Sequence, residues 1–150
     1  MAGGNKATNM VYKRDIISHP CAVIQIFRGS PVSINAAGYL VHSSDVSGEC
    51  FAGFAEENVD NTGGSVGDLS CKVRRVGIVK PDHDNIVDDI TIANVGDFAY
   101  AETLHTSSAD WQFGLSVTNS VMVGRIVNFI STNKADVIFE GFHGQVDTNT

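Results

Sequence analysis

The sequence lacks any apolar run that approaches the roughly 18 consecutive residues of a membrane span. Charged residues are also scarce, at 18% of 150 residues, and the basic ones are a minority, with 10 Lys and Arg against 17 Asp and Glu. The net charge of −7 opposes binding to phosphate backbones, so we expect neither a membrane nor a nucleic-acid partner. The start, MAGGNKATNMVYKRDI, is polar throughout and has no signal-peptide pattern, so we expect a soluble protein made in a cytoplasm.

Cysteine and histidine patterns for metal binding are missing as well. Cys21, Cys50 and Cys71 are widely spaced, with no C-x-x-C motif, and we expect free, mostly buried thiols. The five histidines show neither H-x-H nor H-x-x-x-H spacing, so we expect no metal centre and no cofactor. His19 and Cys21 lie close together, but the proline between them and the adjoining flexible segment disfavour a preorganised nucleophile.

Two loops fall short of known ligand-binding motifs. The acidic stretch Asp82 to Asp89, DHDNIVDD, has Ile86 at its third alternate position and no following Gly, so it does not match an EF-hand loop. The glycine-rich stretch Asp60 to Gly67, DNTGGSVG, lacks the Gly-Lys-Ser/Thr ending of a P-loop. We interpret the first as a solvated acidic loop and the second as a turn in which Gly63, Gly64 and Gly67 supply positive φ.

What the sequence does contain is short β-branched runs, broken about every ten residues by Gly, Asn, Asp or Ser clusters. Helical periodicity is hard to find, and this pattern predicts an all-β fold, a small β-barrel or β-sandwich of about eight short strands. The predicted strands are Ala22 to Phe27, Val32 to Ile34 with Tyr39 to His42, Cys50 to Ala55, Leu69 to Val79, Asp89 to Ile92, Phe98 to Glu102, Val121 to Ile130 and Ala135 to Phe142.

Two features of these strands refine the prediction. The apolar positions change parity after Arg74 and Arg75, which suggests a β-bulge at that point. Near the C-terminus, VMVGRIVNFI and ADVIFEGF flank STNK, which predicts a hairpin. Val121 to Ile130 carries apolar side chains at both parities, so we expect both of its faces to be covered by sheet or by a neighbouring subunit.

The first 21 residues differ in texture from the rest of the chain. They begin with Gly, Asn and Thr and continue with the mixed segment VYKRDIISHP, which offers little apolar area to offset the entropy of ordering. We therefore divide the chain into an extended N-terminal arm, residues 1–21, and a β-rich domain, residues 22–150. We expect a chain without Met1 to Ser18 to keep its fold.

An ordered series of motifs resembles the small capsid decoration, or cement, proteins of tailed bacteriophages. Their layout is a glycine-apolar-alanine strand followed by a loop, a strand ending in Gly-x-Val, a Gly-Asp turn and strand with the pattern Gly-Asp-x-Val-Tyr, and a terminal Gly-x-Val hairpin. The matching residues are Gly53-Phe54-Ala55, Arg75-Val76-Gly77-Ile78-Val79, Val95-Gly96-Asp97-Phe98-Ala99-Tyr100 and Val123-Gly124-Arg125-Ile126-Val127, and the likeness covers roughly Val32 to Phe142. The segment Leu104 to Ser120 departs from the layout.

The resemblance implies a non-enzymatic structural protein of the virion, located on the capsid exterior. Its expected partners are the major capsid protein and itself, as a homotrimer whose several weak contacts add through multivalency. For the capsid contact we expect Tyr12, Ile16 and Ile17 of the arm to anchor in a shell groove and Lys13 and Arg14 to meet acidic neighbours. Trp111 and Phe113 are expected to pack on the shell surface.

Two other classes of function compete with this hypothesis. A receptor- or glycan-binding β-module of a phage fibre or tail would use Trp111, Tyr100 and Phe113 as a stacking platform for a sugar ring. A small trimeric β-barrel enzyme, such as a nucleotide hydrolase, would need a metal-binding carboxylate beside a phosphate-binding loop. The sequence has no matching set of nucleophile, base and orienting residue, so we expect no enzymatic activity.

Overall fold

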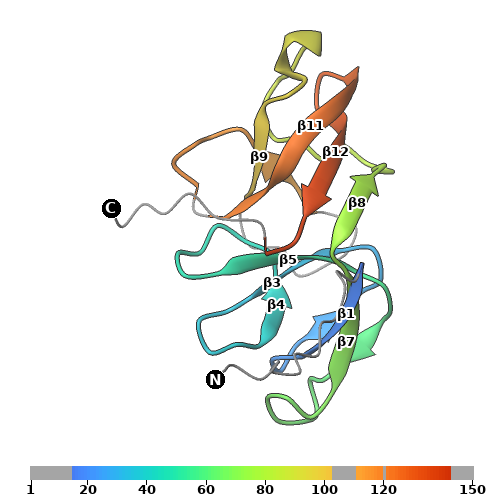
Figure 1. Cartoon of the computed structure of the whole chain (residues 1–150), viewed down its shortest axis with the longest axis vertical. Helices are drawn as coiled ribbons and strands as arrows, with labels where there is room; N and C mark the ends of the chain where they lie inside the picture. The colour runs from blue at the N-terminus through green and yellow to red at the C-terminus, as the bar shows by residue number, and fades with distance from the viewer. Residues whose placement is uncertain (1–14, 103–110, 120, 143–150) are drawn as a thin grey trace, which may run out of the picture.

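The computed structural model describes residues 15–102, 111–119 and 121–142, and most of their regular structure is β-strand (Figure 1). The described residues include one helical turn, the 3₁₀ helix η1 (Ile92–Asn94). The prediction of an all-β fold is confirmed. In chain order the strands are β1 (Ile16–Pro20), β2 (Gln25–Ile26), β3 (Pro31–Ile34), β4 (Leu40–His42), β5 (Cys50–Ala55), β6 (Val59–Asp60), β7 (Ser70–Arg74), β8 (Val76–Val79), β9 (Phe98–Ala101), β10 (Phe113–Gly114), β11 (Met122–Ser131) and β12 (Lys134–Glu140).

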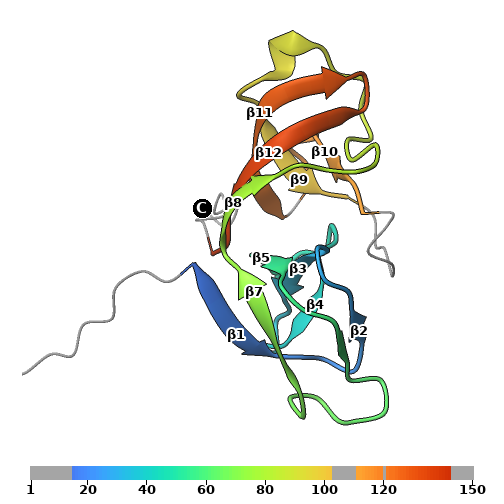
Figure 2. The same cartoon turned by 90° about the vertical axis from the view of Figure 1, so that its right-hand side faces the viewer.

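Two five-stranded sheets contain most of these strands. The first sheet has the order β1-β7-β5-β3-β4, the second has the order β10-β9-β11-β12-β8, and β2 pairs separately with β6. Neighbouring strands within each sheet are antiparallel. Each order has two end strands with a single neighbour among the described residues, so a closed barrel is not formed there, and a β-sandwich of short strands fits. Figures 1 and 2 show the second sheet at one end of the molecule and the first sheet at the other.

β5 lies between two apolar cores, which explains its uninterrupted apolar sequence CFAGFA. Phe51 and Phe54 belong to a larger core that is built mainly on the second sheet. Ala52 and Ala55 belong to a smaller core that includes Cys21, Cys71 and Val73 of the first sheet's region. The pairing of β5 with β3 shifts register between Gly53 and Phe51, and this bulge breaks the alternation of side chains, so Phe51 and Phe54, three residues apart, reach the same core.

The chain passes from the first sheet to the second at Arg75, between β7 and β8. β7 pairs with β1 and β5, whereas β8 pairs with β12. Figure 2 shows β8 continuing directly from β7 into the other sheet. The change in apolar parity that suggested a bulge coincides with this change of sheet.

Glycines in the strands allow close approach between backbones. Gly53 has φ +141°, and a Cβ at this position would overlap the carbonyl group of Arg74. A Cβ at Gly124 would likewise overlap the carbonyl group of Ile138 on β12. These two glycines belong to the motifs that carry the family resemblance, and in this fold they serve strand packing.

The glycine-rich loop between β6 and β7 was predicted only in part. Gly67 has φ +80°, as expected, but Gly63 and Gly64 do not have positive φ, so that part of the prediction is wrong. Gly64 is required for space instead, because a Cβ there would lie 2.7 Å from Oδ1 of Asn61. The buried amide of Asn61 holds this loop by donating to the carbonyl oxygens of Cys21, Ala22 and Ser65.

The C-terminal hairpin is confirmed. β11 and β12 pair from Gly124 opposite Phe139 to Ser131 opposite Lys134, which leaves Thr132 and Asn133 as the turn. Two register shifts interrupt this ladder, one between Ile126 and Asn128 and the other between Phe129 and Ser131.

Two predicted strands are wrong or overextended. Asp89 to Ile92 forms no strand, and within Ala22 to Phe27 only Gln25 and Ile26 are paired. The chain around Asp89 is held by the hairpin turn instead, because the Ile90 N–H donates to the Thr132 carbonyl oxygen at 2.7 Å. A single backbone hydrogen bond of this kind holds a loop in place but does not make the repeated pairing of a β-strand.

The last part of the predicted N-terminal arm, Ile16–Pro20, is a strand of the first sheet. β1 pairs with β7 over its whole length, from Ile16 opposite Arg74 to Pro20 opposite Ser70. Cys21, placed at the end of the arm by the sequence, is fully buried in the smaller core. The predicted boundary at residue 21 thus falls directly after a strand of the first sheet, whose partner β7 lies some fifty residues away in sequence. Deleting Met1 to Ser18 would remove part of β1, so a truncation that spares the sheet must stop before Asp15.

Candidate interaction surface

Trp111 and Phe113, predicted to contact a partner, are buried inside the larger core. Their exposed fractions are 3% and 1%. The Phe54 ring of β5 packs edge-on against both, with centroid distances of 5.5 Å to Trp111 and 6.2 Å to Phe113. Tyr100 is also buried, with 7% exposed. The predictions of a shell contact and of a sugar-stacking platform at these side chains are therefore corrected: their rings stabilise the core.

The arm residues divide into two groups. Ile16 and Ile17 lie in β1, opposite Arg74 and Val73 of β7, with Ile16 exposed and Ile17 half-buried. Tyr12, Lys13 and Arg14 lie outside the described residues, so their predicted part in partner binding stays a prediction.

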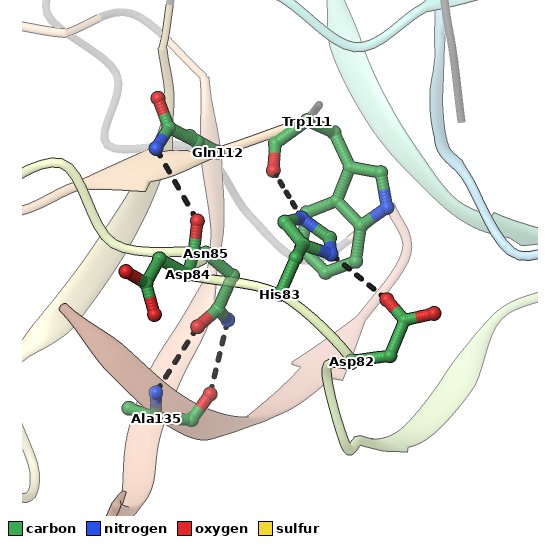
Figure 3. A network of polar contacts seen from close by, with 7 residues as sticks. All are labelled: Asp82, His83, Asp84, Asn85, Trp111, Gln112 and Ala135. Atoms are coloured by element: carbon green, nitrogen blue, oxygen red, sulfur yellow. Dashed lines mark hydrogen bonds and ion pairs between the residues drawn. The ribbon is translucent and has the colours of Figure 1, made fainter. Parts of the chain in front are cut away.

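The acidic stretch Asp82 to Asp89 fastens the end of the second sheet (Figure 3). Asn85 is fully buried, and its side chain exchanges two 3.0 Å hydrogen bonds with the backbone N–H and C=O of Ala135 on β12. Nε2 of His83 lies 2.8 Å from the Trp111 carbonyl oxygen. On the outer side, the Asp88 carboxylate accepts the N–H of Leu115 at 2.8 Å. The aspartates are exposed, and Asp88 together with the residues between the carboxylates attaches the loop to the second sheet.

The Asp82 carboxylate has a local partner in this loop. Oδ1 of Asp82 is 2.9 Å from Nδ1 of His83, and this hydrogen bond holds the pKa of the Asp82 carboxyl below its usual range. In the described part of the chain, no three or more His, Cys, Asp or Glu side chains gather in a group that could hold a metal ion.

The thiols lie in apolar surroundings. Cys21 and Cys71 are buried in the smaller core, Cys50 is half-buried, and all three are free, as predicted. Burial raises the pKa of the Cys21 thiol, and that of the Cys71 thiol to about 12. The Cys21 sulfur lies 4.0 Å from the His19 backbone carbonyl, a weak interaction that does not involve the imidazole ring. This geometry gives no activated Cys-His pair, since a nucleophilic thiolate needs a depressed pKa.

The second sheet turns an apolar face toward solvent. Ile78 of β8, Ile138 of β12, Arg125 of β11 and Phe98 of β9 lie opposite one another in register, so their side chains form one row across four strands. The exposed fractions are 50% for Ile78, 46% for Ile138 and 37% for Phe98. We call this row of four residues the outer row. Fully solvated antiparallel faces usually carry polar residues, so the three apolar members are the unusual feature.

A groove of about 520 Å³ runs along the outer row. Val76, Gly77 and Met122 also line it, and Asp15 and Glu140 add carboxylates to the lining. The Arg125 guanidinium lies over the Phe98 ring, 4.2 Å from the centroid, in a cation–π arrangement. The groove therefore combines apolar area with charges of both signs, the composition of a protein-binding surface.

A second hollow of about 550 Å³ lies at the junction of the two sheets and shares Ile78 and Phe139 with the groove. Its lining is more polar and includes Glu56 and Arg74, whose side chains form an ion pair at 2.5 Å.

The four residues of the outer row lie in predicted strands, but the sequence does not show which face of the sheet they occupy. In VIFE of β12, Val137 and Phe139 face the core while Ile138 faces solvent. The apolar residues at both parities of Val121 to Ile130 were expected to be covered. The sheet leaves Phe129 and Ile130, near the hairpin turn, 36% and 47% exposed, so cover of these two side chains by a neighbouring subunit stays a prediction. The sequence signal for an exposed apolar face was the presence of apolar residues at both parities of a strand. The order of the strands in the sheet is needed to tell which parity faces solvent.

Comparison of the chain with models of protein families, with curated proteins and with solved structures gives no match. The part of the chain that the structure describes contains no helix with the length and hydrophobicity of a membrane span.

Proposed function

We propose that the protein is a non-enzymatic structural protein of a phage virion, which binds the outer surface of the assembled capsid and stabilises it as a cement protein. The observation that carries this proposal is the outer row, with three large apolar side chains held in solvent on a regular sheet. Exposed apolar area of this kind favours burial against another protein. The partner in the proposal is the major capsid protein.

The composition of the surface also supports a protein partner. Aromatic and arginine side chains are enriched in protein interfaces, and Phe98 and Arg125 supply one of each beside Ile138 on a strand framework. The net charge of −7 suits a place outside the shell, away from packaged nucleic acid.

The proposed oligomer is a homotrimer. Phe129 and Ile130 expose apolar area close to the hairpin turn, separate from the outer row, and a neighbouring copy would bury it. Three copies attached to several shell subunits would then add weak contacts into a stable clamp. Light scattering coupled to size exclusion tests this point, and a monomer at micromolar concentration contradicts it.

Capsid attachment is tested by cosedimentation with undecorated heads. Ile138→Glu places a carboxylate in the outer row beside Arg125, and the matched control Val66→Glu places one in the loop between β6 and β7, where Val66 is 52% exposed. Both side chains are about half exposed, so we expect the melting temperatures of the two variants to stay close to that of the unmodified protein. We expect Ile138→Glu to weaken binding at least tenfold, or about 1.4 kcal/mol per site, with Val66→Glu unchanged.

Two outcomes contradict the proposal at different levels. Equal binding by both variants would show that the outer row is not the attachment surface. Failure of the unmodified protein to saturate heads would remove the capsid as the partner.

A further inference from the structure

β8 is an end strand of the second sheet and has a free edge. On one side it pairs with β12, and on the other side it has no strand neighbour among the described residues. Gly141, the residue after β12, donates its N–H to the Arg75 carbonyl oxygen, so Arg75 faces the β12 side. Because antiparallel strands bond through alternate residues, Gly77 continues this bonding, whereas Val76 and Ile78 turn their N–H and C=O groups away from β12.

The backbone groups on this free edge are available to a partner. In the described part of the chain, no backbone hydrogen bond of a turn or loop involves Val76 or Ile78. Unpaired N–H and C=O groups along a strand edge are a template for another strand, and peptide-binding domains use them to hold extended segments.

The groove and the hollow lie on opposite faces of β8. Val76 and Ile78 line the groove, on the face that carries the outer row. Ile78 and Val79 line the hollow, together with Phe54 and Trp111 of the larger core. Successive side chains of a strand added beside β8 would alternate between these two spaces. No residue of the other end strands, β1, β4 and β10, lines either cavity, so this combination distinguishes β8.

The charges of the hollow favour an acidic partner. Its lining includes three cations and two carboxylates, which belong to Arg28, Arg74, Lys80, Glu56 and Asp82. Arg74 is paired with Glu56, and Lys80 is paired with Asp136. The Arg28 backbone N–H donates to Asn58, but the Arg28 guanidinium makes no hydrogen bond or ion pair within the described part of the chain. A guanidinium without a partner can bind a carboxylate through two parallel hydrogen bonds.

We propose that an extended segment of the capsid protein adds to the free edge of β8 as a sixth strand of the second sheet. The bound segment places apolar side chains in the groove and an acidic side chain beside Arg28 in the hollow. This inference rests on the proposed function and specifies the form in which the capsid protein binds. The outer row supplies apolar contact, and the strand edge supplies directional hydrogen bonds.

Two variants at one position test the backbone pairing. The Ile78 N–H faces the free edge, so Ile78→Pro removes no hydrogen bond to β12. Ile78→Ala is the matched control, because both variants lose the isoleucine side chain and only the proline variant loses the N–H. We expect Ile78→Pro to bind undecorated heads at least tenfold more weakly than Ile78→Ala, with similar melting temperatures. Equal binding by the two folded variants would overturn the added strand.

Hydrogen exchange of the unmodified protein tests the same pairing without a substitution. Measured at single amides, the N–H groups of Val76 and Ile78 should exchange at least tenfold more slowly on saturated heads than in solution. The Gly77 amide, already bonded to β12, should change less. Unchanged exchange at Val76 and Ile78 would contradict the proposal.

Charge reversal tests the acidic side chain of the partner. Arg28→Glu should weaken head binding at least tenfold, whereas the control Lys72→Glu makes the same charge change on an exposed residue that lines neither cavity. Equal losses would contradict a carboxylate at Arg28. Heads that bind the protein and distinguish Ile138→Glu from Val66→Glu, but do not distinguish Ile78→Pro from Ile78→Ala, would support the capsid as partner and remove the added strand. Heads that do not bind the unmodified protein would remove both.

Discussion

Replacement of Asn85 by alanine tests how the acidic loop stabilises the second sheet. Asn85 is fully buried and acts as a strand partner for Ala135, accepting its N–H and donating to its C=O, each at 3.0 Å. Ala135 itself is fully buried, so the variant leaves two backbone groups without partners in an apolar core. Each such group costs about 1 to 3 kcal/mol, which gives a loss of about 2 to 6 kcal/mol.

A loss of this size is a large part of the roughly 5 to 15 kcal/mol that stabilises a domain. For a chain of this length it corresponds to a fall in melting temperature on the order of 10 °C. The matched control is Gln112→Ala in the neighbouring segment, whose side chain donates to the Asp84 carbonyl oxygen at 3.3 Å in an exposed hydrogen bond (Figure 3). We expect that control to cost less than about 0.5 kcal/mol.

Urea unfolding followed by tryptophan fluorescence measures both variants, since Trp111, the sole tryptophan, lies in the same core. The slope with denaturant should be unchanged, so that the midpoint reports stability. A loss below about 1 kcal/mol for Asn85→Ala, or a loss equal to that of Gln112→Ala, would refute the argument that this side chain completes the sheet.

Three further predictions concern the rest of the fold. Burial lowers the pKa of His19 below its ordinary value of 6.5, so the unfolded chain takes up a proton more readily and the stability of the fold decreases as the pH drops below 6.5. His19→Gln should therefore reduce the decrease in melting temperature between about pH 7.5 and pH 5.5. A variant with the same decrease as the unmodified protein would contradict this. The Cys71 thiol, with a pKa raised to about 12, should resist alkylation at about pH 8 in the folded protein and react in urea, as mass spectrometry would show; equal rates would be inconsistent with its burial. Gly124→Ala should destabilise the protein by at least about 2 kcal/mol in thermal unfolding, because the added Cβ meets the Ile138 carbonyl group. The control Gly63→Ala has open space around it and should be nearly neutral. Similar losses of stability in the two variants would argue against the close approach of the two strands.

Local patterns in the sequence were sufficient for the hairpin of β11 and β12. Two β-branched runs that flank a short polar turn are each other's pairing partners, so the hairpin can be predicted without knowledge of distant residues. β1 is the opposite case, because IISHP is short and mixed, and its strand character depends on β7, which follows some fifty residues later. Strand propensity describes a fit to neighbours, and those neighbours are not visible from the segment itself.

The same limit applies to the predicted site residues. Trp111 and Phe113 lie in a polar stretch, which suggested exposure, but Phe54 and the loop around His83 enclose them. The outer row was hidden for a related reason: Ile78 and Ile138 stand in apolar runs of both parities, and burial of one parity cannot be assigned until the sheet order is known.

The position of β5 between the two cores has a consequence for synthesis on the ribosome. Phe51 and Phe54 pack with Trp111, Phe113 and Phe139, so their final partners emerge as many as 85 residues after Phe54. At about 5 to 20 residues per second, the nascent chain carries two exposed aromatic rings for about 4 to 17 s before the larger core can close. The first sheet cannot bury both faces of its central strand in that interval, so productive folding of the whole chain waits for the C-terminal hairpin.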